Sequence, residues 1–129
     1  MSTPFDQARY QVRTDWGAEG LARLAASDVV IVVDVLRFST TVCVRVEAGE
    51  TVPLDDAAHA VSLNGAAVAA AAAAGGAVVL LGCLRNASAV AREVLDEQRR
   101  RGRRTSIAVI AAGERTSREP QSPMRFAVE

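Results

Sequence analysis

The sequence predicts an α/β fold of three layers, in which helices cover both faces of a mainly parallel sheet. Residues 29–33 and 77–81 are continuously apolar rather than alternating, and residues 106–111 are apolar after Ser106, as in strands that are buried on both faces. Segments of helical character separate them. Strands that alternate with helices form parallel sheets through crossover connections, so this order indicates an α/β/α arrangement.

The first half of the chain is expected to add two helices and one further strand. Residues 16–26 carry apolar side chains at helical spacing, and the first apolar strand follows them and ends at Asp34. Ser39 is a favourable N-cap residue and Gly49 a helix stop, which predicts a short helix between them. A strand over residues 50–54 is expected to follow.

The second half predicts two helices around the remaining strands. The alanine run over residues 66–74 has the highest helix propensity available, and residues 86–101 form a helical segment with a basic last turn. The tail after Gly113 is polar and broken by proline until residues 124–128, which predict a short closing strand. The expected order of elements is αβαβαβαβ.

Composition limits the class of protein. The chain has 129 residues and 50% hydrophobic residues, enough for one domain, 1–129, with a single core. Fifteen arginines balance fifteen acids, so no overall field attracts nucleic acid or a membrane, and neither is an expected partner. The polar N-terminus and the lack of a membrane span predict a cytoplasmic location, and Cys43 and Cys83 are interpreted as buried thiols.

Ligands of parallel α/β folds bind at the carboxyl ends of the strands, so the loops 34–41, 82–88 and 112–119 are the candidate sites. In the first loop, Asp34 ends a strand and Arg37 precedes hydroxyls that open a helix. Arginine, hydroxyls and helix amides together favour a phosphate, and an aspartate can hold Mg²⁺ opposite it. Alternatively, Ser39 caps the helix and Asp34 pairs with Arg37.

The other two loops have the same features in weaker form. Arg85 and Asn86 precede a helix, where they would bind an anion or act only as a surface charge and a helix cap. Glu114 follows the last strand and would serve as a metal ligand, a base or a simple loop charge. His59 is interpreted as a surface residue, and the arginines over 99–104 as a stabilised helix end with RNA binding as the weaker alternative.

Several blocks of the sequence together resemble the 2-phosphosulfolactate phosphatase family in content and order: YQVRTDWGAEGL, VVIVVDVLRFSTTV, NGAAVAAAA, LGCLRNASAVA, IAVIAAGER and RFAVE. The resemblance implies a phosphoric monoester hydrolase that uses Mg²⁺. The substrate would be a small phosphorylated sulfonate, or a related phosphate monoester, converted to sulfolactate and phosphate as in coenzyme M biosynthesis.

Matching motif positions assign roles to ten residues. The assigned residues are Asp34, Arg37, Ser39 and Thr40 as catalytic; Thr41, Asn64, Arg85 and Asn86 as substrate-binding; and Asp34, Glu114 and Glu129 as metal ligands.

The chain departs from the family by a short connection after the strand expected over residues 50–54 and by its end at Glu129. It is therefore expected to be an incomplete family domain, and exposed apolar edges would favour a homo-oligomer. Two rival interpretations are a degenerate domain that binds phosphate or sulfonate without turnover, and an assembly module that packs through its alanine-rich helices.

Overall fold

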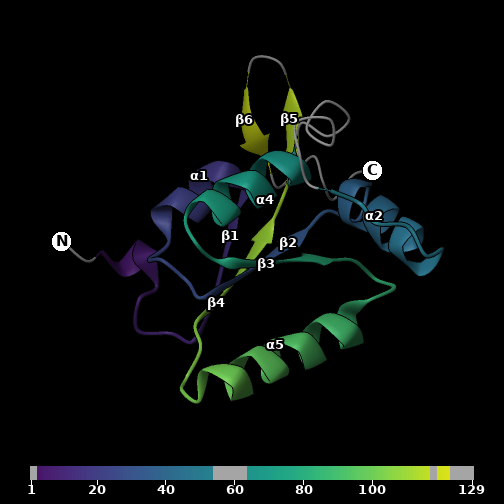
Figure 1. Ribbon diagram of the computed structural model, residues 1–129. Helices are drawn as coiled ribbons and strands as arrows, with labels where there is room; N and C mark the ends of the chain where they lie inside the picture. The colour runs from purple at the N-terminus through teal and green to yellow at the C-terminus, as the bar shows by residue number, and fades with distance from the viewer. Residues whose placement is uncertain (1–2, 54–63, 117–118, 123–129) are drawn as a thin grey trace.

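The computed structural model describes residues 3–53, 64–116 and 119–122, and side chains as far as residue 113. Figure 1 shows the arrangement of the elements. In chain order they are η1 (Pro4–Asp6), β1 (Val12–Trp16), α1 (Gly17–Arg23), β2 (Val29–Val33), α2 (Phe38–Glu47), α4 (Gly65–Ala74), β3 (Val78–Gly82), α5 (Ala87–Arg101), β4 (Ile107–Ala111), β5 (Glu114–Thr116) and β6 (Glu119–Ser122).

Four strands form one parallel sheet in the order β1-β4-β2-β3. The register is level at the carboxyl edge, because Val33 at the end of β2 lies opposite both Gly82 and Ala111. The loops that leave β2, β3 and β4 therefore start side by side.

Helices cover both faces of this sheet. Figure 1 shows α1 and α4 together on one face and α5 on the other, and α1 and α4 contact each other. The short helix α2 lies at the carboxyl end and contacts β3. These layers confirm the predicted three-layer α/β fold.

The two faces of the sheet are buried to different extents. Val30 and Val32 of β2 and Ile110 of β4 are fully or almost fully buried beneath α1 and α4, where α4 packs through alanines and Val68. On the other face Ile31 remains partly exposed, and α5 buries only Val94. The larger core therefore lies under α1 and α4. The small alanine side chains of α4 allow this helix to pack closely against the sheet.

The apolar strands and the main helices agree with the sequence prediction to within a few residues, but three differences appear. The strand β1 was not expected, because its three central residues are all polar and the one buried residue among its five is Arg13. Residues 50–53 form no strand, and β3 occupies the place beside β2. The polar segment after Gly113 pairs as the β5–β6 hairpin. The closing strand predicted over residues 124–128 lies outside the described residues.

No helix in the described part of the chain is both long and apolar enough to cross a membrane.

Candidate functional site

Asp34 is the central residue of the carboxyl edge. It follows the last residue of β2, and its side chain is only 3% exposed. One carboxylate oxygen, Oδ2, accepts a hydrogen bond of 3.1 Å from the backbone amide of Gly65. Burial raises the pKa of Asp34, and the backbone amides of Gly65 and Phe38 oppose this rise.

The N-terminus of α4 reaches Asp34 because its first residue is glycine. A Cβ atom at Gly65 would lie 2.5 Å from Oδ2 of Asp34 and 2.7 Å from a ring carbon of Phe38. Any larger residue would separate helix and carboxylate. The Asn64-Gly65 pair, which the sequence left open as a turn or an amide-lined loop, therefore forms the start of α4 against Asp34.

Two predicted catalytic hydroxyls hold the backbone of the Asp34 loop. Ser39 is fully buried, and its Oγ donates to the Val32 carbonyl at 2.9 Å and accepts from the Asp34 amide at 3.2 Å. The Oγ1 of Thr40 donates to the Val35 carbonyl at 2.6 Å. Both hydroxyls therefore fix the position of Asp34.

Arg37 and Thr41 are exposed at the same edge. Arg37 is the N-cap residue of α2, and the peptide bond before it is cis. Within the described residues, its guanidinium makes no ion pair, so the pairing with Asp34 considered from the sequence does not form. A cation without an acidic partner among the described residues thus follows the end of β2.

Asn64 supplies an oxygen next to the residue that contacts Asp34. It immediately precedes Gly65, whose amide contacts the carboxylate. Its Oδ1 atom is buried and has no hydrogen-bond partner among the described residues. A buried amide oxygen without a partner is costly unless a ligand supplies one.

The second predicted loop is stabilised by its own side chains. Asn86 accepts a bond of 2.8 Å from the Cys83 amide and donates one of 2.8 Å to the Leu81 carbonyl, so it closes the turn rather than capping α5. Arg85 is exposed and pairs with Glu47 of α2 at 2.6 Å. Neither side chain is free for a substrate in this arrangement.

Cys43 belongs to α2 and Cys83 to this loop, and both are free thiols. Burial raises the pKa of the Cys43 thiol, and a hydrogen bond with Cys83 raises it further. The raised pKa favours the protonated form of the Cys43 thiol. The prediction of two buried thiols is confirmed for Cys83, whereas Cys43 is only partly buried.

The third loop begins with Gly113, which has a left-handed φ of 68° and allows the chain to turn from β4 into β5. The backbone of Glu114 belongs to β5, but its side chain lies outside the described part of the molecule, as do His59 and Glu129.

The oxygen atoms at the carboxyl edge fit a magnesium ion in kind. The described residues contain no cluster of three or more His, Cys, Asp or Glu side chains suited to a metal. Mg²⁺, however, usually binds one or two carboxylates and keeps several waters. The Asp34 carboxylate and the Oδ1 atom of Asn64, which has no partner among the described residues, are oxygen ligands of the kind that Mg²⁺ binds.

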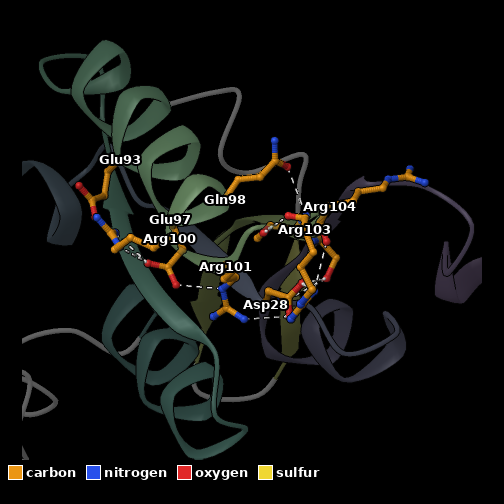
Figure 2. Close-up of polar contacts among 10 residues, drawn as sticks. Asp28, Glu93, Glu97, Gln98, Arg100, Arg101, Arg103 and Arg104 are labelled. Carbon is orange, nitrogen blue, oxygen red and sulfur yellow. Dashed lines mark hydrogen bonds and ion pairs between the residues drawn. The ribbon is translucent and has the colours of Figure 1, made fainter.

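A second polar cluster, at the amino edge of the sheet, was not identified from the sequence. Figure 2 shows Asp28, just before β2, joined to Arg101, the last residue of α5, and to Arg103, which follows the helix. Asp28 also accepts bonds from the amide and hydroxyl of Ser106 at 2.8 and 3.0 Å. Hydrogen bonds from Arg103, with those of Ser106, hold the pKa of Asp28 far below its usual range.

This cluster partly confirms the interpretation of the arginines over 99–104 as a stabilised helix end. Helix α5 ends at Arg101 and Gly102 caps it in the left-handed conformation. Arg100 pairs with Glu93 and Glu97 within the helix. The i to i+3 spacing signals the pair of Glu97 with Arg100 in the sequence, whereas Glu93 lies seven positions away from Arg100. The contact of Arg101 with Asp28 spans more than seventy positions and has no local signal.

Comparison with known proteins gives no match: no family model, no curated protein and no solved structure is significantly similar to the chain.

Proposed function

We propose that the chain is a Mg²⁺-dependent phosphatase acting on the phosphate ester of a small sulfonated hydroxy acid, with 2-phosphosulfolactate converted to sulfolactate and phosphate. The observation that carries the proposal is that two groups of opposite charge follow one strand end without forming an ion pair with each other. Asp34 is a buried carboxylate, and Arg37, three positions later, is an exposed guanidinium without an acidic partner in the described chain.

Asp34 and Asn64 would hold the metal ion. When bound, Mg²⁺ would polarise the phosphoryl group and offset its negative charge. Ser39 holds the backbone of Asp34 and the amide of Gly65 holds its carboxylate, so little ordering is needed when the ion binds. A raised pKa at Asp34 means that metal binding competes with a proton more strongly than at an ordinary aspartate.

Arg37 would bind the phosphate group. Its planar guanidinium can donate two parallel hydrogen bonds to phosphate oxygens and stabilise the charge on them during transfer. Thr41 is exposed one helical turn further along α2 and can donate a hydroxyl to the same substrate. The choice of a sulfonated substrate is supported by the sequence resemblance alone.

A second candidate function is anion binding without turnover. The specific observation in its favour is the enclosure of Asp34, which is 3% exposed and already bonded to Gly65. The side chains of Ser39, Thr40 and Asn86 also favour this candidate, because they already donate hydrogen bonds to backbone carbonyls. This candidate requires Arg37 but needs neither Asp34 nor the metal.

The test is phosphate release from a panel of phosphate monoesters that includes 2-phosphosulfolactate, with Mg²⁺ or with a chelator. We expect Mg²⁺-dependent release in the wild type and a loss of about 100-fold or more in both Asp34→Asn and Arg37→Ala. Arg45→Ala is the matched control, because Arg45 lies on the same helix in an exposed pair with Glu50.

The possible results separate the two candidates. Folded wild type that binds phosphate through Arg37 but releases none supports the binding domain. Release that persists in Asp34→Asn or in the chelator overturns the metal-dependent mechanism, and an equal loss in Arg45→Ala overturns the assigned role of Arg37.

A further inference from the structure

The amino edge of the sheet contains a hollow of about 230 Å³. Three separate segments line it: the residues just before and in β1, the residue before β2 and the residues before β4. Its charged lining residues are Arg9, Arg13, Arg103, Arg104 and Asp28. Four arginines against one aspartate give this lining a net positive charge.

The single carboxylate in the hollow is already neutralised. Asp28 accepts from Arg103 at 2.9 and 3.1 Å, and from Arg101 at 3.2 Å. It therefore has no capacity to balance the charge of the other arginines.

Arg13 is a buried cation without a carboxylate partner in the described chain. The residue is only 7% exposed. The atoms that accept its hydrogen bonds are neutral, namely the carbonyl oxygens of Ala8, Tyr10, Ala25 and Ala26 and the hydroxyl of Ser27. Carbonyl dipoles satisfy the donors but leave the positive charge unbalanced, and a nearby anion would stabilise it.

Arg9 and Arg104 are exposed at the same hollow. Neither forms an ion pair among the described residues. Figure 2 shows that the Arg104 side chain extends away from Asp28. These two long, exposed side chains have no acidic partner in the described chain and can therefore reach a ligand that binds beside Arg13.

We infer that this hollow is an anion site that binds a small compound carrying one or two phosphate groups. Guanidinium groups from different segments match phosphate oxygens in charge and in paired hydrogen-bond geometry. The small volume favours a compact ligand over a polymer. The site is separate from the proposed phosphatase site, because it lies at the opposite ends of the strands.

The experiment is isothermal titration calorimetry of the full chain with inorganic pyrophosphate and with inorganic phosphate, at low salt in a non-phosphate buffer. We expect saturable binding in the wild type, weakened about tenfold in each of Arg9→Ala and Arg104→Ala. These side chains are exposed and make no ion pair in the described chain, so both variants should fold; circular dichroism checks this.

A control fixes the location of the binding. Arg92→Ala removes an exposed arginine of α5 away from the hollow and should bind as wild type. The inference is overturned by absence of saturable binding, by an equal loss in Arg92→Ala, or by unchanged affinity in both Arg9→Ala and Arg104→Ala. Binding of single-stranded RNA that excludes pyrophosphate at equal charge concentration would also overturn it in favour of a nucleic-acid surface.

Discussion

Strand β2 has an aspartate at each end, and the two differ in their burial, in their partners and in the direction of their pKa shifts. Asp28, before the strand, has a side chain 21% exposed and is held by two arginines and Ser106. Asp34, after the strand, is more deeply buried and receives backbone amides but no cation in the described chain. The pKa of Asp28 is lowered, and that of Asp34 is raised.

The difference shows that the partners of a carboxylate, rather than its residue type or strand position, decide the direction in which its pKa shifts. Asp28 joins α5 to the start of β2 and β4, so its charge stabilises the fold. The burial of Asp34 is unfavourable to its charged form, and no cation of the described residues compensates for it. Groups whose pKa is perturbed in this direction are more frequent at binding and catalytic sites.

The largest expected effect in this comparison is that of Asp28→Ala. The change leaves the Ser106 amide and two arginines without their acceptor, and we expect a loss of about 3 kcal/mol in the free energy of unfolding at pH 7. Urea unfolding followed by circular dichroism measures it. Asp96→Ala is the control, because Asp96 forms only an exposed pair with Arg99 and should cost less than about 0.5 kcal/mol.

The same variant tests the pH dependence. The pKa of Asp28 is lower in the folded state than its ordinary value of 3.8, so its contribution is complete above that value and is lost as the pH falls below it. The wild type and Asp28→Ala should therefore converge in stability in acid. A gap that stays constant down to pH 2.5 would contradict the assigned role of the charge.

A smaller effect is expected from Gly65→Ala at the other end of β2. The new Cβ would contact Oδ2 of Asp34 at 2.5 Å, which displaces α4 and costs about 2 kcal/mol despite the better helix propensity of alanine. Gly75→Ala, at the end of the same helix, meets nothing closer than 3.4 Å and should be neutral within about 0.5 kcal/mol. Equal stability of the two variants would show that the close approach at Gly65 is not required.

The smallest expected effect has the opposite sign. Asp34→Asn keeps an oxygen that can accept from Gly65 and removes a buried charge. We therefore expect its free energy of unfolding at pH 7 to be about 1 kcal/mol higher than that of the wild type. Because the folded pKa of Asp34 is raised, ionisation destabilises the wild type as the pH rises above 3.8. The advantage of Asp34→Asn should therefore disappear near pH 3. Lower stability of the variant at pH 7 would indicate a cation partner for Asp34.

Much of the fold could be predicted because its signals are local. The strand β2 is a continuous apolar run, and α4 is an alanine run ended by glycine. The strand β1 could not be predicted, because its buried residue is an arginine whose donors are satisfied by carbonyls of distant loops. The β5–β6 hairpin also lacks the apolar alternation that indicates a strand.

The candidate site was predicted less completely than the fold. Asp34 and Arg37 follow from the position of a strand end, which the sequence reveals. The hydroxyls of Ser39 and Thr40 looked available for a ligand in the sequence, yet they donate to carbonyls of residues five or seven positions earlier. Such bonds depend on how the chain turns, which residue types alone do not specify.

The alanine surface of α4 also limits how this protein can change over time. Ala66, Ala69 and Ala72 face the core with side chains that cannot be shortened except to glycine. Nearly every mutation at these positions adds volume to a filled space, whereas the exposed Ala71 and Ala73 have room for larger residues. Sequence drift in this helix should therefore be confined to its outer face, and the inner face should remain a stretch of small residues in any descendant that keeps the fold.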